Sequence, residues 1–356
     1  MSKALVLCGG AGTRLRPFTF ASAKQVLPVA NKPIVHHIME KLALAGINDA
    51  GVIISPEKGS IVKHCLGGGD RWGISVTFIE QNRPAGLAHA VAAAREFLGE
   101  CPFLMYLGDN LAEVNLRDYW QDFLCGSDDA AAFLKEVDDP RQFGVAVIAD
   151  SGRLIKVVEK PAAPPGNLAL TGIYFFRKTI HGAISRTKPS QRGELEITDA
   201  IQSLIDTGGS VKGHVMGGWW HDTGSVEDIL QANSVVLKSM EHRPPQGEAC
   251  PFSTLEGPVI IGEGSRVMQS LIKGPVIIGD RVTVKNSFIG PDVSVGDSCL
   301  LDGTKIENTI IMHGCNLAGV TLKDSMIGSC CSTHKRNAGN GCHRLVLGDH
   351  SHIAMD

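Results

Sequence analysis

The chain has 356 residues, which exceeds the length of one typical domain, so the sequence predicts two domains. A formal net charge of −3 argues against a nucleic-acid-binding surface, and a hydrophobic content of 43% is ordinary for a globular protein. No run of residues is apolar enough to span a bilayer, and the first strand begins too early to leave room for a signal peptide. We therefore expect a cytoplasmic protein that binds neither nucleic acid nor membrane.

The first predicted element is a buried strand over residues 3–8, and a glycine-rich loop follows it at residues 9–14. Three glycines in four positions let the backbone turn sharply and bring its N–H groups close to a ligand. Arg14, Arg16 and Lys24 add positive charge directly after the glycines. A loop rich in N–H donors beside fixed positive charge is what a polyphosphate requires.

This loop is neither of the two common nucleotide-binding loops. A P-loop would continue from Gly12 with Lys and then Ser or Thr, whereas Thr13 and Arg14 follow here. A dinucleotide fingerprint would have a third glycine where Leu15 stands and an acidic residue about 20 positions later, and residues 30–33 contain none. The loop therefore indicates a different class of phosphate site.

After the loop, strands and helices are predicted to alternate. The expected elements are a helix after Asn31, which would be its N-cap, a strand at 51–54, a helix starting at Ser55 and Pro56, a strand at 74–80, a helix at 88–98 and a strand at 102–107. Alternation of this kind predicts a mainly parallel α/β sheet, in which ligands bind beyond the carboxyl ends of the strands. Residues 9–14, Gln81 and Asp109 all follow predicted strands, so we expect them to converge.

The second part of the predicted first domain has a looser pattern. Strands are expected at 130–137, 145–149, 153–159 and 170–176, and helices at 197–207 and 225–240. We interpret this part as an α+β region that covers the sheet and supplies a second ligand subsite. The first domain is accordingly predicted to span residues 1–240.

A proline-rich stretch without periodicity, residues 241–252, is predicted to be a linker. The same six residues then occur at 257–262 and at 274–279, which gives a period of 17 (274 minus 257). Short aliphatic–glycine repeats of this kind predict a parallel β-helix over residues 253–356, in which each coil buries its aliphatic side chains against the next. A small β-sandwich would not reproduce the same six residues.

The C-terminal tail contains a group of possible metal ligands. Residues 329–341 lose the repeat and are expected to be irregular, and Cys330, Cys331, His334, Cys342 and His343 lie close together in the sequence. They lack a paired Cys-x-x-Cys spacing, so the sequence does not favour zinc. We expect the ten cysteines of a cytosolic chain to be reduced.

Residues 9–19 and 23–33 together resemble the signature of the sugar-1-phosphate nucleotidylyltransferases. Further segments match the same family: 81–88, 106–110, 158–161, 170–174, 192–199 and 217–224. The match is most similar to the glucose-1-phosphate thymidylyltransferases, and the repeats resemble the hexapeptide repeat of left-handed β-helices, which marks the long form of that group. The resemblance implies a Rossmann-like α/β nucleotidyltransferase sheet with an α+β sugar-binding part, followed by a left-handed parallel β-helix.

The resemblance also implies a nucleotide site. Its residues would be Leu7, Gly9, Gly10, Ala11, Gly12, Thr13, Arg14, Gln25, Gln81, Pro84, Gly86 and Leu107. The amide of Gln81 can read both a donor and an acceptor on a pyrimidine edge, and Gly86 would let the base approach the backbone. The alternative for these two residues is an ordinary loop before the next helix.

A metal site and a sugar-phosphate site are implied in the same way. Asp109 and Asp222 would hold Mg²⁺, because two hard carboxylates together with phosphate oxygens suit this ion. Either aspartate alone could instead be a helix cap or a turn residue. The sugar-phosphate site would consist of Asn110, Gly144, Glu159, Lys160, Thr171, Tyr174 and Arg192.

The expected reaction is nucleotidyl transfer. An oxygen of a sugar-1-phosphate, expected to be glucose-1-phosphate, attacks the α-phosphorus of a nucleoside triphosphate, expected to be dTTP, and pyrophosphate leaves in line. Arg14, Lys24 and Lys160 are the expected catalytic residues, because positioning and charge neutralisation dominate such transfers. We expect these small-molecule substrates to be the main partners of a homo-oligomer whose size the sequence does not give.

Three alternatives remain open from the sequence. Cys8, His89 and His221 depart from common residues of the family, which leaves the base and the sugar open to uridylyl, guanylyl or adenylyl transfer, or to a cyclitol phosphate acceptor. The β-helix could add acetyl transfer, with His313 as a general base, although a histidine on a coil turn is expected to point outward. A non-catalytic regulatory subunit is disfavoured by the intact charged residues.

Overall fold

The computed structural model describes residues 2–240, 246–335 and 341–355. These residues separate into two compact units. Unit 1 contains the chain up to Ala11 together with Ile34–Asp222, and unit 2 contains Gly12–Pro33 together with the chain from Thr223 onwards. Within the described ranges, no helix has the length and apolar character needed to cross a membrane.

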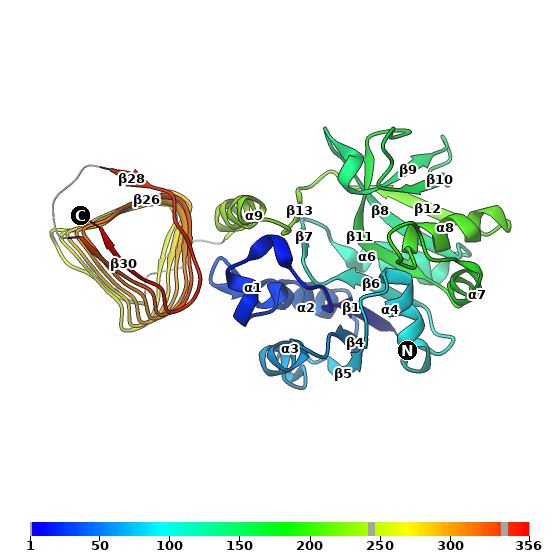
Figure 1. The fold of residues 1–356 in the computed structure, drawn as a ribbon, viewed down its shortest axis with the longest axis horizontal. Helices are drawn as coiled ribbons and strands as arrows, with labels where there is room; N and C mark the ends of the chain where they lie inside the picture. The colour runs from blue at the N-terminus through cyan, green and yellow to red at the C-terminus, as the bar shows by residue number, and fades with distance from the viewer. Residues whose placement is uncertain (1, 241–245, 336–340, 356) are drawn as a thin grey trace. The chain divides into compact units, whose positions relative to one another are not determined.

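Unit 1 is built on a nine-stranded mixed sheet (Figure 1). Its main path runs through β10 (Leu154–Glu159), β9 (Gly144–Ile148), β11 (Leu168–Phe176), β6 (Phe103–Leu107), β1 (Lys3–Leu7), β4 (Asp49–Ile54) and β5 (Ser75–Glu80), and β8 (Ala130–Glu136) joins β11 to β12 (Val211–Val215). Strands β6, β1, β4 and β5 pair in parallel, whereas β11 is antiparallel to β6. The predicted parallel pairing is thus found in the part of the sheet formed by β1, β4, β5 and β6, which come first in the chain.

Helices cover this sheet as expected for an α/β unit. They are α2 (Ile34–Leu44), α3 (Gly59–Leu66), α4 (Leu87–Ala93), α5 (Arg95–Leu98), α6 (Leu116–Cys125), α7 (Thr179–Arg186) and α8 (Ile197–Asp206). One core cluster joins the apolar sides of α4, α7 and α8 to the strands, and Ile201, Ala183 and Val91 are among its fully buried side chains. Burial of this apolar face, rather than helix propensity, holds these short helices.

Three details of the helix predictions are wrong. Asn31 is not an N-cap: Ala30 and Asn31 both have positive φ and form the turn of a small hairpin between β2 (Pro28–Val29) and β3 (Lys32–Pro33). The helix expected at 88–98 is two helices that meet at Ala94. The helix expected from Ser55 begins only at Gly59.

The second sheet of unit 1 is small and was not predicted. It pairs β7 (Asn110–Ala112) with β13 (Trp220–Asp222) in antiparallel fashion. Helices α6 and α7 and strand β12 were also missed by the sequence analysis. The small sheet matters most, since it joins two segments that are far apart in the sequence.

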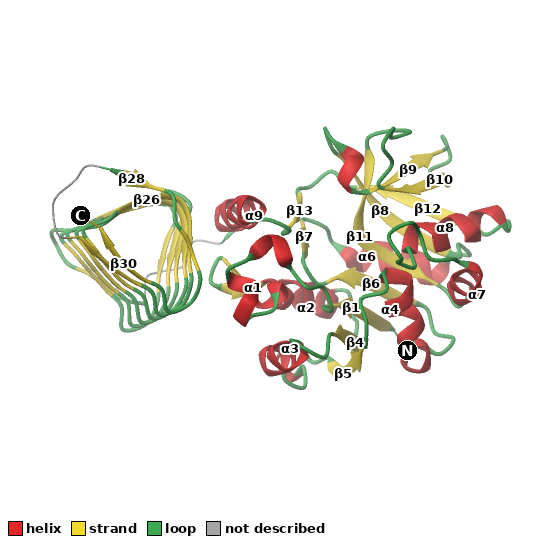
Figure 2. Ribbon diagram, in the orientation of Figure 1, coloured by secondary structure: helices red, strands yellow, loops and turns green. Residues whose placement is uncertain are grey.

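Unit 2 contains parallel coils that fit a left-handed β-helix, visible as stacked arrows in Figure 2. One sheet consists of β14 (Glu248–Ala249), β17 (Arg266–Met268), β20 (Thr283–Lys285), β23 (Leu300–Asp302), β25 (Asn316–Ala318), β27 (Ser332–Lys335) and β30 (His352–Met355). The other consists of β15 (Thr254–Glu256), β18 (Leu271–Lys273), β21 (Phe288–Ile289), β24 (Lys305–Ile311), β22 (Val293–Val295), β19 (Val276–Ile278), β16 (Val259–Ile261), β26 (Thr321–Ile327), β28 (Cys342–His343) and β29 (Val346–Leu347).

The register of the coils explains the repeat. Thr254 pairs with Leu271, which is an advance of 17 residues (271 minus 254), and the aliphatic side chains of successive coils form one continuous core. The expectation of an irregular stretch at 329–341 is wrong for β27, which pairs with two neighbouring strands, and residues 336–340 lie outside the described part. Within the predicted linker, β14 already pairs with β17, and residues 241–245 lie outside the description.

Unit 2 also contains helix α9 (Val226–Ser239), which begins with a capping box between Ser225 and Asp228. Asn233 of this helix is fully buried, and its Oδ1 accepts hydrogen bonds from the backbone N–H of Ala30 at 2.8 Å and from the hydroxyl of Ser294 at 2.7 Å. One amide therefore ties the β2–β3 hairpin and the β-helix to the same helix.

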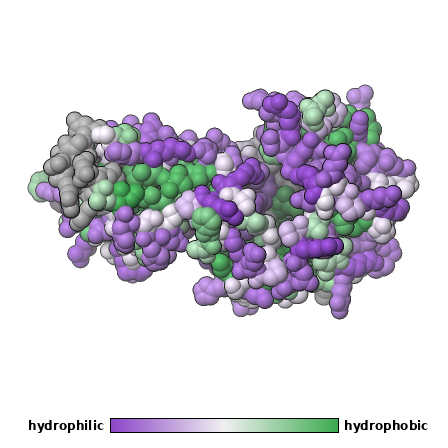
Figure 3. All heavy atoms as spheres, in the orientation of Figure 1, coloured by the Kyte–Doolittle hydropathy of each residue, from purple (hydrophilic) through white to green (hydrophobic). Residues whose placement is uncertain are grey.

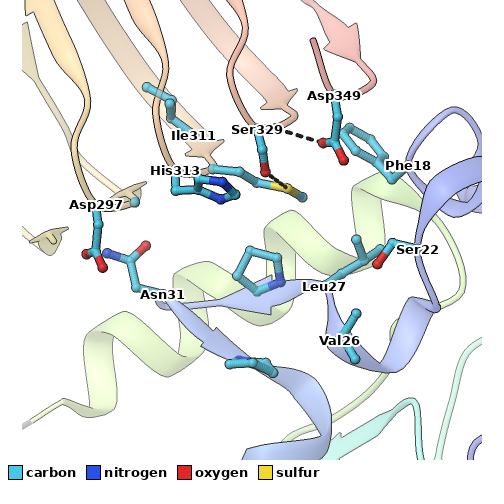
Figure 4. Close-up of a pocket in the computed structure, with 14 residues that line it drawn as sticks. Phe18, Ser22, Val26, Leu27, Asn31, Asp297, Ile311, His313, Ser329 and Asp349 are labelled. Atoms are coloured by element: carbon cyan, nitrogen blue, oxygen red, sulfur yellow. Dashed lines mark hydrogen bonds between the residues drawn. The ribbon is translucent and has the colours of Figure 1, made fainter. Parts of the chain in front are cut away.

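A pocket of about 290 Å³ lies in unit 2 beside this hairpin (Figure 4). Its lining residues are Phe18, Ser22, Val26, Leu27, Pro28, Asn31, Pro33, Gly296, Asp297, Ile311, Met312, His313, Ser329 and Asp349. Asp297 and Asp349 accept hydrogen bonds from the backbone N–H groups of Asp280 and Ser329, so both carboxylates cap coil turns. His313 is exposed on its coil turn, as expected.

Candidate active site

The carboxyl ends of the parallel strands form one edge of the sheet in unit 1. The hydrogen-bond ladder continues past the strands, because the N–H groups of Cys8, Gln81 and Gly108 donate to the carbonyls of Ile53, Ile54 and Leu7. Gly9, Gly10 and Ala11, then Gln81, and then Asp109 therefore leave neighbouring strands at the same edge. The expected convergence of the loop, Gln81 and Asp109 at strand ends is confirmed for the part of the loop in unit 1.

Gln81 is buried at this edge and its amide is fully oriented. Its Nε2 donates to the carbonyl of Gly86 at 3.2 Å and to Nδ1 of His89 at 2.9 Å. Its Oε1 faces Gly9, where an added Cβ would lie 3.3 Å from the oxygen. An amide nitrogen has two hydrogens, so both are used within the protein and the oxygen is the group left to accept from a ligand. In this arrangement the amide offers the base an acceptor, and its expected role as a donor to the base stays a prediction.

Gly86 has a backbone reason to be glycine. Its φ is +99°, and a Cβ there would lie 2.4 Å from the backbone oxygen of Leu195. Leu195 also holds the segment on both sides, because its N–H donates to Ala85 at 2.8 Å and its carbonyl accepts from Ala88 at 3.0 Å. The carbonyl that orients Gln81 is thus itself fixed.

The other expected nucleotide residues of unit 1 have less specific surroundings. Leu7 is buried at the end of β1, and Leu107 ends β6 and packs so closely on Gly172 that a Cβ there would lie 2.6 Å from the leucine side chain. Gly10, Ala11 and Pro84 are exposed. Leu7 and Leu107 therefore contribute packing at the sheet edge rather than polar groups.

The remaining loop residues belong to unit 2. Gly12 has a φ of +65°, its carbonyl accepts from the hydroxyl of Thr19 at 2.7 Å, and Thr13 opens a short 3₁₀ turn, Thr13–Leu15. The guanidinium of Arg14 lies against Gly224, where a Cβ would be 2.6 Å from Nη2. Arg16 instead stacks on the ring of Phe20. The two arginines thus differ, and Arg14 is held by backbone contact.

Gln25 and Lys24 lie on the next 3₁₀ turn, Lys24–Val26. Gln25 is buried, and its Oε1 has no hydrogen-bond partner in the described part of the chain. A buried acceptor without a partner costs stability, so it indicates a group that arrives from outside the chain. This observation supports the expectation that Gln25 contacts a ligand.

Asp109 and Asp222 are brought together by the small sheet. In the β7–β13 pair, Asp222 lies directly opposite Asn110, the residue after Asp109. Asn110 is buried, and its Nδ2 donates to Oδ1 of Asp109 at 3.1 Å. Trp220 donates from Nε1 to Oδ1 of Asn110 at 2.9 Å. One hydrogen of the Asn110 amide nitrogen thus orients the carboxylate of Asp109, and the expected contact of Asn110 with the sugar phosphate stays a prediction.

This pair of carboxylates fits a divalent ion only in part. Among the described residues, no group of three or more His, Cys, Asp and Glu side chains could hold a metal. Asp109 and Asp222 would therefore supply two ligands, and the rest would come from phosphate oxygens and water, which is the way Mg²⁺ is usually bound at phosphate sites.

The sugar-side residues form a charged cluster around Glu159. Glu159 accepts from the hydroxyl of Thr198 and from Nη2 of Arg192, both at 3.1 Å. Arg192 also donates to the buried Glu196 at 2.9 Å and lies 3.6 Å from Glu194. One guanidinium is thus shared by three carboxylates and supports Glu159, and its expected contact with the sugar phosphate stays a prediction.

Lys160 and Gly144 complete this cluster. Lys160 has a positive φ of 38°, and its Nζ lies 3.9 Å from Oε1 of Glu159 on the exposed side. Gly144 pairs with Glu159 across β9 and β10, and a Cβ there would lie 2.7 Å from Thr198. Lys160 is therefore the better placed cation for a phosphate, and Gly144 makes room for the hydrogen bond between Thr198 and Glu159.

Thr171 and Tyr174 are buried and do not offer side chains to a ligand. The hydroxyl of Thr171 donates to the carbonyl of Phe133 at 3.0 Å, and Tyr174 stacks on Phe176. Burial, followed by the nearby Glu159 carboxylate, raises the pKa of Tyr174 well above its ordinary range. We therefore expect Thr171 and Tyr174 to act in sugar binding through their backbone groups or by their contact with Glu159.

Trp220 connects the two groups of residues. Its Nε1 donates both to Asn110 and to the carbonyl of Thr171, and its ring contacts that of Phe143 at 5.1 Å between centroids. The carbonyl of Phe143 accepts from the N–H of Lys160 at 3.0 Å. Trp220 and Phe143 therefore link Asn110, beside Asp109, to the Glu159–Lys160 cluster within unit 1.

Several of these residues were missed from the sequence. Trp220, Glu196, Thr198 and His89 lie within segments that were recognised, but no role was assigned to their side chains. The signal that could have found Glu196 is an acidic residue four positions after Arg192, directly before an apolar helix, where a buried ion pair is the natural explanation. The contact between Gln81 and His89 has no signal in the sequence alone.

The cluster predicts a pH dependence for sugar binding. Burial, and then the neighbouring Glu196, raise the pKa of Glu159 above its ordinary value of 4.5. As the pH falls through this raised pKa, the carboxylate takes up a proton, loses its charge and accepts more weakly from sugar hydroxyls. We therefore expect the KM for the sugar phosphate to rise in acid at a pH above 4.5, measured by initial rates across a pH series.

The variant Glu159→Gln should have a raised KM at every pH of the series, and its KM should no longer rise further in acid. Glu194→Gln, which alters a more exposed carboxylate on the same arginine, is the matched control and should keep the rise in acid. An unchanged rise in Glu159→Gln would assign the titration to another group.

Residues 3–239 match the Nucleotidyl transferase family, and the chain belongs to this family. It is 44% identical over 350 residues to a glucose-1-phosphate thymidylyltransferase of Streptomyces griseus, with 98% of both chains covered. It is also 44% identical over 355 residues to a glucose-1-phosphate thymidylyltransferase of Streptomyces antibioticus, with 99% of both chains covered. A solved Bacillus anthracis protein in complex with sucrose is 34% identical, with a TM-score of 0.63, and the match covers 68% of this chain and 98% of that one.

Proposed function

We propose that the protein transfers the thymidylyl group of dTTP to glucose-1-phosphate. An oxygen of the sugar phosphate forms a bond to the α-phosphorus, the bond from that phosphorus to the bridging oxygen breaks, and pyrophosphate leaves. The two Streptomyces glucose-1-phosphate thymidylyltransferases align over nearly the whole chain, including the β-helix. The structural observation that carries the proposal is Trp220, which joins a carboxylate pair suited to a phosphate-bound cation to a cluster suited to a sugar.

Each group has a role that follows from its surroundings. The oxygen of Gln81 accepts from the base, Glu159 accepts from sugar hydroxyls, and Lys160 holds the sugar phosphate. Arg14 neutralises charge on the departing pyrophosphate, and Lys24 acts at the α-phosphate, so catalysis consists of positioning and electrostatic stabilisation. Mg²⁺, held by Asp109 and Asp222, would supply further neutralisation of phosphate charge, and divalent metal use is general in this family.

The proposal includes cytoplasmic action as a homo-oligomer. Ile260 and Ile277 lie at the outward position of β16 and β19, between buried neighbours, and are only half-buried. Hydrophobic residues also gather on the visible face of the β-helix (Figure 3). Apolar surface of this kind marks association sites in many proteins.

A pyrophosphate-release assay tests the proposed reaction. The assay compares dTTP, UTP, GTP and ATP, each with glucose-1-phosphate, and we expect the highest kcat/KM with dTTP and the second highest with UTP. A methyl group contributes roughly 1 kcal/mol in a pocket, so the preference over UTP should be only several-fold. A higher kcat/KM with GTP or ATP would contradict the assignment of the base.

A further inference from the structure

The contact between Gln81 and His89 carries an inference about how the base is chosen. His89 lies on α4, two residues after the helix begins at Leu87, and is half-buried. Its Nδ1 is 2.9 Å from Nε2 of Gln81. An amide nitrogen can only donate, so Nδ1 of the histidine accepts and the ring hydrogen lies on Nε2.

The two acceptors around Nε2 decide which way the amide points. Gly86 presents a carbonyl and, in this tautomer, His89 presents a bare ring nitrogen, so a reversed amide would place its oxygen against two acceptors unless the ring moved its hydrogen to Nδ1. That orientation would lose two hydrogen bonds and bring like partial charges together. The chain therefore fixes Oε1 towards Gly9, and the carbonyl at Gly86 is held in turn by Leu195.

We propose that His89 is a positioning residue for base selection, which acts by locking the Gln81 amide with its oxygen towards the nucleotide. This inference rests on the proposed function and identifies the group of the base that Gln81 recognises. An oxygen at this point requires an N–H on the base. Thymine and uracil present N3–H, whereas cytosine presents an acceptor at N3 and would face the amide oxygen unfavourably.

The test compares kcat and KM for dTTP and dCTP in three proteins: wild type, His89→Leu and His89→Asn. Leucine removes the acceptor at Nδ1 and leaves the carbonyl of Gly86 as the group that opposes reversal, so the reversed amide becomes more populated. Asparagine can place an oxygen close to where Nδ1 lies, so it should retain the lock. His214→Leu is the matched control, because His214 is also half-buried and lies in unit 1, on β12.

We expect His89→Leu to raise the KM for dTTP about 5- to 10-fold, the loss that corresponds to one hydrogen bond, with kcat little changed. Its dTTP-to-dCTP ratio of kcat/KM should fall by at least the same factor, because the reversed amide suits cytosine. His89→Asn should recover most of the ratio, and His214→Leu should keep the wild-type ratio.

The outcomes separate the two proposals. A wild-type protein that uses neither dTTP nor UTP would contradict the proposed function itself. A wild-type protein that prefers dTTP, together with a His89→Leu variant that is folded and has an unchanged dTTP-to-dCTP ratio, would overturn the inference about His89. A His89→Leu variant that loses kcat equally for both nucleotides, with the same ratio, would also overturn it, since that result indicates a general structural role. Circular dichroism and thermal unfolding establish that each variant is folded.

Discussion

Asp109→Asn and Asp222→Asn are each expected to abolish most of the turnover while leaving the protein folded. Asp222 lies opposite Asn110, the residue next to Asp109, in the small sheet. Two carboxylates that bind one site repel each other unless a cation lies between them. Loss of a shared cation ligand should cost several kcal/mol in the transition state, which corresponds to about 10²- to 10³-fold in kcat.

The double variant Asp109→Asn, Asp222→Asn distinguishes a shared ion from two separate roles. If both carboxylates act through one ion, the double variant should lose little more activity than either single variant. Additive losses would show that the two aspartates act independently. Asp122→Asn, on an exposed position of α6, is the control and should keep wild-type kcat.

The same idea predicts the effect of removing the metal. Turnover should stop when a chelator is added and should return with Mg²⁺. Because the amide variants relieve the repulsion between two carboxylates, their thermal stability without added metal should equal or exceed that of the wild type. Full activity in the presence of a chelator would rule out a catalytic metal at this pair.

The sequence predicted the sheet edge well because it depends on local patterns. Short apolar runs followed by Gly9, Gln81 and Asp109 define strand ends, and parallel strands bring such ends to one edge. The 17-residue repeat likewise predicted the coils, since identical sequence segments pack in the same way. In both cases the information lies in a few consecutive residues.

Contacts between residues that are distant in the sequence decide what many side chains do, and the sequence did not predict these contacts. It did not predict that Trp220, which lies 110 positions away, donates to the amide oxygen of Asn110. Nor did it predict that three carboxylates share the charge of Arg192, including Glu159 on β10. Asn31 was expected to cap a helix, but its side chain donates to the carbonyl of Val295 in the β-helix.

Replacing Arg14 is the second change with a large expected effect. Its guanidinium lies against the buried Gly224, where a Cβ would be 2.6 Å from Nη2 and 3.0 Å from Cζ and would displace the arginine. An arginine that neutralises charge in phosphoryl transfer contributes about 10³-fold or more to kcat, so Arg14→Ala should lose at least that much. Arg14→Lys should recover only part of it, because a lysine is a point charge without the planar fork.

Gly224→Ala tests the position of the arginine without removing its charge. The added methyl must push the guanidinium aside, and a shift of about 1 Å in a catalytic group can cost as much as 10²-fold, so kcat should fall by an intermediate amount. The double variant Arg14→Ala, Gly224→Ala should be no worse than Arg14→Ala alone, since the methyl then has nothing to displace. Gly217→Ala is the matched control, because a Cβ there meets no atom within 4 Å. Equal losses of kcat in Gly217→Ala and Gly224→Ala would show that the segment 217–224 is sensitive to any added methyl group, and that the contact with Arg14 is not the cause.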